Sequence, residues 1–274
     1  MNAELVVSRR DPTELTTDAP STTVLLATTA LLASVPSPVR SADANPAIAG
    51  IRPGMAADEV KAKLKELSPR TLYRTYRSTK ADGTGDFIRG LSINIDSGEP
   101  GEGYNAQDRV GVVFNQFSGG AEMVMRWQTF PRASLPGLAP INAAVANAYG
   151  TVLKRESTMR GPSFVGLAMR DRDGKETHDT KCVYTTTGNS VGGMLMEGMN
   201  TWTDFYPQCG VLVRVEVTPS ERDEAIASGM QQRMADTQAI LQEIGERERI
   251  GKAAADERAK AERAHANAVA VPRL

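Results

Sequence analysis

The sequence predicts an α+β fold: two tandem modules, each a short helix followed by about four antiparallel strands, and then a long C-terminal helix. Three observations lead to this prediction. A helix pattern followed by strand patterns occurs twice between residues 45 and 217. The strand patterns are joined by short segments rich in Gly, Asp and Pro, which suit antiparallel neighbours rather than parallel strands with crossover helices. After Pro219 the sequence becomes helical and highly charged.

The first predicted module covers residues 45–130. Val60, Leu64 and Leu67 follow one another at i, i+4 and i+7, which predicts an amphipathic helix over residues 56–67. Ser68 and Pro69 end this helix. Strands are predicted for four segments that follow it: residues 71–79, 87–95, 110–117 and 122–130.

The second predicted module covers residues 140–217. Three prolines within residues 131–140 mark the boundary before it. A helix is predicted over residues 141–149, closed by Gly150, a residue type that suits the position after a helix end. Strands are again predicted for four segments: residues 151–157, 163–170, 180–186 and 210–217. Asp173-Gly174 fits a hairpin turn between two of them.

Residues 219–274 are predicted to form a helix and a solvated tail. The stripe that predicts the helix is made of apolar residues at three- and four-residue steps or sums of them: Ile226, Met230, Met234, Leu241 and Ile244. So narrow a stripe suits either docking on a sheet or a coiled coil with another helix. We expect residues 225–244 to pack on the second sheet, because the link to the preceding strand is short. Residues beyond Gly251 carry mostly alanine and charge and can bury little.

The composition excludes two broad classes. With 32 basic and 33 acidic residues the net charge is -1, whereas a nucleic-acid-binding protein needs a basic surface. No apolar run reaches the length of a transmembrane helix, so none is expected in the mature chain.

The N-terminal residues 1–44 have the pattern of a signal peptide for export. A short apolar run lies within residues 22–35, two prolines follow it, and Ala42-Asp43-Ala44 places cleavage between Ala44 and Asn45. We therefore expect a periplasmic or secreted protein, without a lipid anchor because no Cys follows the run. The alternative is a buried helix of a cytosolic domain, since the segment before the run is long and carries acidic residues.

Cys182 and Cys209 are the two cysteines of the chain. An even count in an exported protein predicts one disulfide bond. It would close a loop of 26 residues and stabilise the fold by about 3.5 kcal/mol if chain entropy dominates. The alternatives are a catalytic thiol or a zinc pair, for which the two histidines provide a poor ligand set.

Residues 49–60 (AGIRPGMAADEV) carry a resemblance to a known family. The segment resembles the start of exported bacterial modules of the SmpA/OmlA kind and of proteins with the β-lactamase-inhibitor fold. In that pattern a Ser or Thr begins the helix and an acid three residues later completes a capping box. Here Ala56 occupies the capping position and Glu59 keeps the acid. The resemblance implies a non-catalytic module that binds other proteins.

Two motifs could carry chemistry instead. Gly188–Gly192 matches the G-x-S-x-G pattern, so Ser190 is the nucleophile of an alternative serine-hydrolase hypothesis, with Asp204 and His265 in the required order. The simpler interpretation is a glycine-rich loop. A turn with Asp171, Asp173 and Glu176 could touch calcium, but it lacks the other ligands of a calcium loop.

The loop 188–200 (GNSVGGMLMEGMN) is the most unusual segment and a speculative binding site. Its flexible apolar side chains suit varied partners: Met194, Leu195, Met196 and Met199. Alternatively they fold into the core. The sequence thus predicts a non-catalytic binding protein for another protein or an envelope component, with no cofactor and no metal. The hydrolase is the alternative.

Overall fold

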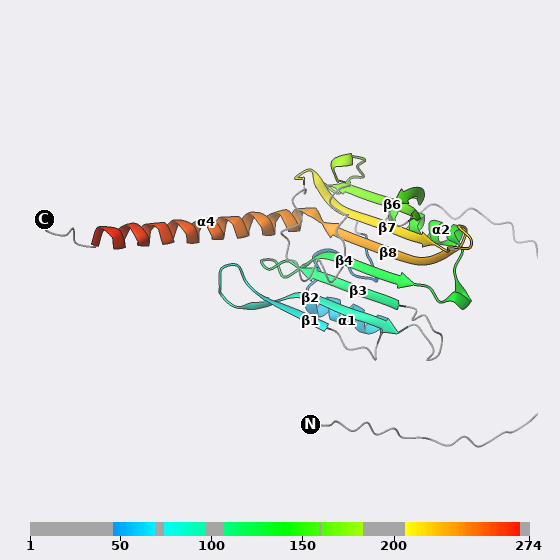
Figure 1. Ribbon diagram of the computed structural model, residues 1–274, viewed down its shortest axis with the longest axis horizontal. Coiled ribbons are helices and arrows are strands. Elements are labelled where there is room, and N and C mark those ends of the chain that lie inside the picture. Colours follow the sequence, from blue (N-terminus) through cyan, green and yellow to red (C-terminus); the bar gives the residue numbers. More distant parts are fainter. Residues whose placement is uncertain (1–45, 69–73, 97–106, 159–160, 183–205, 269–274) are drawn as a thin grey trace, which may run out of the picture. The chain divides into compact units, whose positions relative to one another are not determined.

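The computed structural model describes residues 46–68, 74–96, 107–158, 161–182 and 206–268. All eight strands belong to one antiparallel sheet with the order β1-β2-β3-β4-β8-β7-β6-β5 (Figure 1). The strands are β1 Arg74–Thr79, β2 Asp86–Asp96, β3 Gln107–Phe114, β4 Ala121–Thr129, β5 Lys154–Thr158, β6 Gly161–Asp171, β7 Cys209–Pro219 and β8 Ala227–Asp236. The helices are α1 Ala57–Leu67, α2 Leu138–Tyr149 and α4 Thr237–Ala268, with short 3-10 helices at Arg132–Ser134 and Thr180–Cys182.

The prediction of two separate helix-plus-sheet modules is wrong, because the strands form a single sheet. β4 pairs with β8 along most of its length, from Met123↔Ala235 to Thr129↔Gly229. Buried side chains from both halves of the sheet belong to one hydrophobic cluster, so Val112 of β3 and Val215 of β7 share a core. The sheet therefore buries its apolar face once, as a continuous layer.

The predicted helix over residues 225–244 is also wrong in its first half, where the chain forms β8. Met230 and Met234 both pack into the core on the side of α1 and α2. Side chains four residues apart lie on the same face of a helix. They also lie on the same face of a strand, where every second side chain points to the same side. Gln232 lies between the two methionines on that face and donates a hydrogen bond to the Tyr149 hydroxyl. This half-buried polar residue on the core face hid the strand alternation.

The predicted strand over residues 180–186 is not present in its described part, where Thr180–Cys182 forms a turn of 3-10 helix. Residues 183–186 lie outside the described residues. The hairpin turn expected at Asp173-Gly174 does form, with Gly174 at φ 80°. The Asp171 side chain holds it by accepting hydrogen bonds from the backbone N–H groups of Asp173 and Lys175.

Helices α1 and α2 cover one face of the sheet. Val60 and Leu64 of α1 are fully buried there, as their spacing predicts, and Val145 and Tyr149 are the buried residues of α2. At the start of α1 the Glu59 carboxylate accepts a hydrogen bond from the Ala56 backbone N–H at 2.8 Å. Ala56 has no side-chain cap to offer in return. The helix is thus held by burial of its apolar face rather than by a full capping box.

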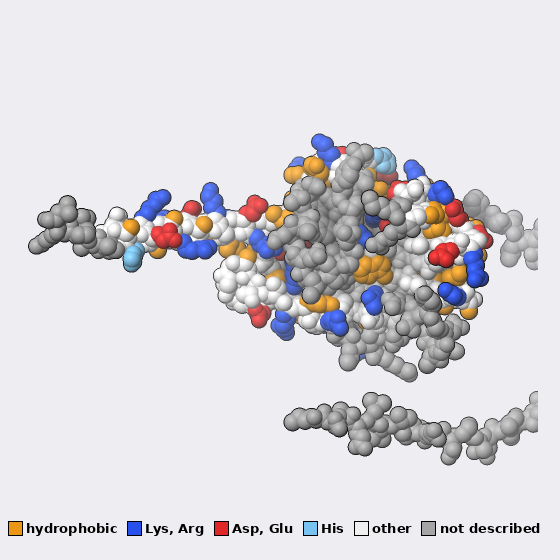
Figure 2. Space-filling model, viewed as in Figure 1, with side chains coloured by type: hydrophobic (Ala, Val, Ile, Leu, Met, Phe, Trp, Pro, Cys, Tyr) orange, Lys and Arg blue, Asp and Glu red, His pale blue; other side chains and the backbone are white. Residues whose placement is uncertain are grey.

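The long helix α4 lies on the other face of the sheet and is buried only at its beginning. Ile240 is fully buried against Val113, Met123 and Ala235. Beyond Gly245 most residues are exposed, and Figure 2 shows acidic and basic side chains along this part of α4. The tail expected beyond Gly251 is therefore a solvated helix that continues to Ala268.

Candidate functional site

The sheet face opposite α1 and α2 carries three parallel rows of side chains, set by strand register. The first row is Asn94, Arg109, Trp127, Gln231, Glu216 and Val165. The second is Ser92, Gly111, Met125, Arg233, Arg214 and Leu167. The third is Gly90, Val113, Met123, Ala235, Leu212 and Met169. Each row crosses from β2 to β6 because side chains alternate between the two faces along every strand.

The third row is apolar and covered. Ile240, Leu241 and Ile244 of α4 pack on its middle. At the β7 end, Leu212 and Met169 pack against the disulfide between Cys182 and Cys209. This row therefore forms a second, smaller core that fixes α4 and the disulfide on the sheet.

The first two rows differ from the third because they carry arginines and a tryptophan. We call their central residues the arginine–tryptophan face: Arg109, Trp127, Gln231, Arg233, Arg214 and Glu216. Arg109 is exposed, and Trp127 opposite it on β4 is half-buried. Arg and Trp are the side chains most enriched at the energetically dominant positions of protein interfaces.

Arginines are the commonest charged side chains on the arginine–tryptophan face. Among its described residues, three arginines lie beside one glutamate, Glu216. Arg214 lies directly opposite Arg233 on the neighbouring strand, an arrangement that costs energy for like charges. Arg214 pairs with Glu216 at 3.2 Å. No described residue accepts a hydrogen bond from the buried Nε of Arg214.

Two β-bulges direct charged side chains from the sheet toward α4. Tyr76 pairs with Gly90 and Arg77 with Ile88, so Arg89 is an extra residue in β2. Val113 pairs with Met123 and Phe114 with Ala121, which makes Glu122 the extra residue in β4. A bulge breaks the regular alternation and redirects the side chain of the extra residue.

Arg89 and Glu122 meet Glu243 of α4 in a buried cluster. Nη1 of Arg89 lies 3.2 Å from Glu122 Oε1 and 2.9 Å from Glu243 Oε2. The exposed fractions of the three side chains are 12%, 0% and 1%. Neutral groups complete the site: Gln116 donates its backbone N–H to Glu243, and Asn115 Nδ2 lies 3.3 Å from Glu122 Oε2.

Burial and charge raise the pKa of Glu122 to about 8. Loss of hydration is the largest cause, because a carboxylate is expensive to bury. Arg89 favours the ionised form of Glu122, whereas Glu243 opposes it. One arginine cannot neutralise two carboxylates, so Glu122 keeps its proton at neutral pH.

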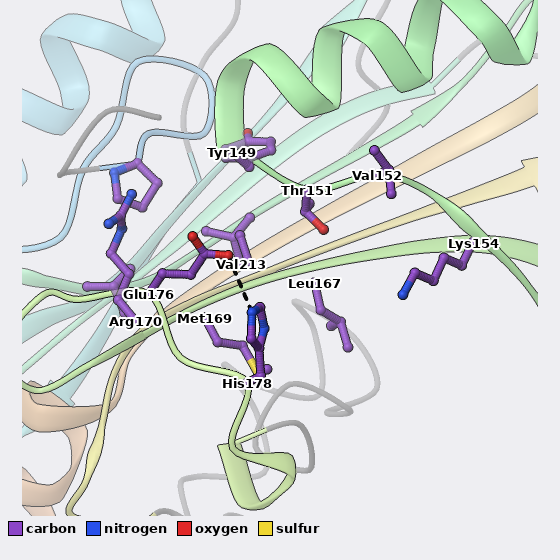
Figure 3. A pocket seen from close by; sticks show the side chains of 14 residues that line it. Tyr149, Thr151, Val152, Lys154, Leu167, Met169, Arg170, Glu176, His178 and Val213 are labelled. Carbon is purple, nitrogen blue, oxygen red and sulfur yellow. Dashed lines mark ion pairs between the residues drawn. The ribbon is translucent and has the colours of Figure 1, made fainter. Parts of the chain in front are cut away.

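A pocket of about 260 Å³ opens beside β6, near the first residue of β5 (Figure 3). Tyr149 and Thr151 border it at the end of α2, and Leu167 and Met169 border it on β6. His178 lies 3.8 Å from Glu176, beyond hydrogen-bond distance, and its side chain is 88% exposed. A catalytic histidine needs a partner that fixes its tautomer and orientation. This pair does not supply one.

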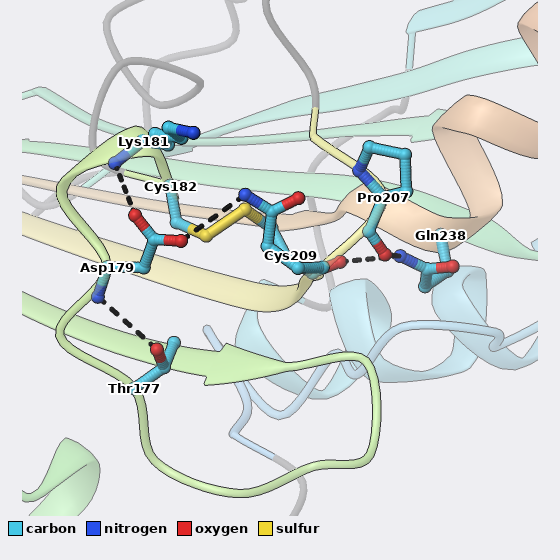
Figure 4. The surroundings of a disulfide bond; sticks show 8 residues. Thr177, Asp179, Lys181, Cys182, Pro207, Cys209 and Gln238 are labelled. Atoms are coloured by element: carbon cyan, nitrogen blue, oxygen red, sulfur yellow. Dashed lines mark hydrogen bonds between the residues drawn. A yellow bond between two sulfur atoms is a disulfide. The ribbon is translucent and has the colours of Figure 1, made fainter.

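The predicted disulfide between Cys182 and Cys209 is present (Figure 4). Both cysteines are fully buried. Gln238 of α4 donates hydrogen bonds to the backbone oxygens of Pro207 and Cys209, which ties the helix start to the disulfide strand. A buried disulfide of this kind is typical of proteins in an oxidising, non-cytoplasmic compartment.

The other predicted site residues are not brought together in the described structure. Met194, Leu195, Met196, Met199, Ser190 and Asp204 lie outside the described residues. His265 lies on the exposed part of α4. Asp171 shapes the hairpin turn, and no group of three metal-ligating side chains occurs among the residues that the structure describes.

Neither the arginine–tryptophan face nor the buried acid pair was predicted from the sequence. Alternation within residues 107–129 contained a signal for the first, because Arg109 and Trp127 fall on the strand face opposite Val110 and Val124. The pair of Glu122 and Glu243 had no such signal. The two glutamates are 121 positions apart in the chain, and a β-bulge turns Glu122 toward α4, so no local sequence pattern relates them.

No protein-family model matches the chain, and neither a curated protein nor a solved structure matches it. Within the described ranges, no helix combines the length and apolarity needed to cross a membrane.

Proposed function

We propose that this protein is a non-catalytic binding protein of the cell envelope or the secreted fraction, and that it binds a protein partner through the arginine–tryptophan face. The observation that carries the proposal is the grouping of three arginines around Trp127 on a rigid sheet. Side chains on β3, β4, β8 and β7 are held in register by backbone pairing, so they are ordered before binding. The resemblance of residues 49–60 to exported binding modules agrees with this function.

The chemistry of the face indicates the kind of partner. A surface rich in arginine favours a partner surface that carries carboxylates. Trp127 and the stems of the arginines offer apolar area, which suits an apolar side chain at the centre of that surface. We therefore expect a protein with an acidic patch around an apolar residue, and an association rate that falls as salt screens the charges.

Site-specific photo-crosslinking in the native organism tests the proposal. A photo-reactive amino acid replaces Arg109 on the face in one strain and Ala143, an exposed residue of α2, in a control strain. We expect position 109 to give a discrete crosslinked protein that position 143 does not give. Equal crosslinking from both faces would contradict the proposal. So would labelling of Ser190 by a fluorophosphonate probe, which reports an activated serine.

A further inference from the structure

The attachment of α4 to the sheet depends on a few contacts near the start of the helix. Ile240 supplies the fully buried apolar contact. Asn115 Nδ2 donates a hydrogen bond to the Ala239 carbonyl at 2.8 Å. Glu243 supplies the charged contact, to Arg89 at 2.9 Å and to the backbone N–H of Gln116 at 3.0 Å. Residues after Gly245 add little, because most of them are exposed.

The charged contact is stable in only one protonation state. Arg89 of β2 and Glu243 of α4 are the charged described groups that act on Glu122 of β4. The turn between β3 and β4 contributes amide groups from Asn115 and Gln116 and no charge. With one carboxyl protonated, the site holds one positive and one negative charge. With both ionised, it holds an uncompensated negative charge at a position almost closed to water.

We propose that the docking of α4 is proton-linked: the proton on Glu122, beside Arg89 and Glu243, holds the helix on the sheet, and release of this proton to solvent frees its first turns. Glu122 is held in place because the next residue of β4, Met123, pairs with both β3 and β8. Glu243 is on the helix, so repulsion between the carboxylates displaces α4. Undocking would uncover Val113, Met123 and Ala235, which continue the surface of the arginine–tryptophan face.

This proposal does not rest on the proposed function, and hydrogen exchange on the full chain tests it directly. Protection of the amides of residues 241–245 is measured by mass spectrometry from pH 5 to 9, after correction for the intrinsic exchange rate. Amides of β7 in the same molecules serve as the internal reference. We expect the opening constant of the helix start to rise by up to about tenfold per pH unit until near pH 8 and then to level off.

Two variants separate proton linkage from general loosening of the helix. Glu122→Gln cannot ionise, and its amide can still donate to Glu243, so its opening constant should not change with pH. Glu246→Gln removes an acid on the same helix that pairs with Arg249 outside the cluster, and it should keep the wild-type pH profile. A pH-independent wild type, or an unchanged pH profile in Glu122→Gln, would overturn the proposal.

A further variant covers the case in which Glu122→Gln does not fold. Glu243→Gln leaves one acid, Glu122, beside Arg89, and removes the carboxylate that ionised Glu122 would repel, so the pH profile should be less steep than that of the wild type. A profile as steep as that of the wild type would assign the linkage to another group and overturn the proposal.

Discussion

At the residue scale, Arg89 and Glu122 reach the same buried site because each is an extra residue in its strand. Without the two bulges, alternation would turn both side chains toward α1 and α2. The bulges therefore interrupt regular strand pairing at two positions, and they place the charged groups that contact α4. The proton on Glu122 makes that anchor electrically balanced.

The stability of the whole protein should fall as the pH rises from about 4.5 to about 8. The pKa of Glu122 is about 8 in the folded protein, against 4.5 without the fold. Between these values the folded chain binds a proton that the unfolded chain has released. Its contribution is complete below the lower value and is lost as the pH rises, with a slope of at most about 1.4 kcal/mol per pH unit.

Urea unfolding at pH 5, 6, 7 and 8 measures this slope. Glu122→Gln should remove most of the slope in this pH range. A variant slope equal to that of the wild type would mean that Glu122 is ionised in the fold.

A second residue-scale expectation concerns Gly210 at the start of β7. A Cβ at this position would overlap the backbone carbonyl of Asp171, and backbone cannot move aside as a side chain can. Gly210→Ala should therefore cost about 1–3 kcal/mol of unfolding free energy, the range for overpacking. Gly245→Ala is the matched control, because a Cβ there meets open space in helix α4. It should stabilise the protein by about 0.5–1 kcal/mol, and the same urea titration checks both variants.

At the element scale, helices α1 and α2 and seven of the eight strands lie where the sequence patterns predict, apart from shifts of their ends. These elements have clear local signals, such as Val60 and Leu64 one helical turn apart. β8 escaped detection because Met230 and Met234 are spaced alike in helix and strand. The single sheet could not be predicted from such patterns, since pairing between β4 and β8 joins residues far apart in the chain.

The two parts of α4 should differ in their effect on stability. Truncation after Lys252 removes an exposed segment and should leave the melting temperature unchanged within about 1–2 °C. Truncation after Asp236 removes Ile240 and Glu243, uncovers the third row and leaves Arg89 with Glu122 alone. It should lower the melting temperature by about 10 °C or more, the effect of losing several kcal/mol.

Thermal unfolding followed by circular dichroism separates these cases. Equal losses from both truncations would show that the exposed half of α4 is structural. Truncation after Thr218 should be worse still, because it removes β8 from the middle of the sheet.

At the scale of the whole molecule, the sheet uses its two faces for different purposes. One face is buried under α1 and α2 and supplies the main core. The other face has two parts. Its apolar row is covered by α4 and by the disulfide, and its two charged rows form the arginine–tryptophan face. This division of the second face is the basis of the binding surface that we propose.

The most direct test of this account is the affinity of the crosslinked partner for two purified variants, measured by isothermal titration calorimetry. The first variant combines Arg109→Ala and Trp127→Ala on the arginine–tryptophan face. The control combines Ala143→Arg and Asn147→Arg on the exposed side of α2. We expect the first to weaken binding by about 100-fold or more, as truncation of two dominant contacts does, and the control to bind like the wild type. Wild-type affinity in the first variant, or loss of binding in the control alone, would contradict the assignment of the binding face.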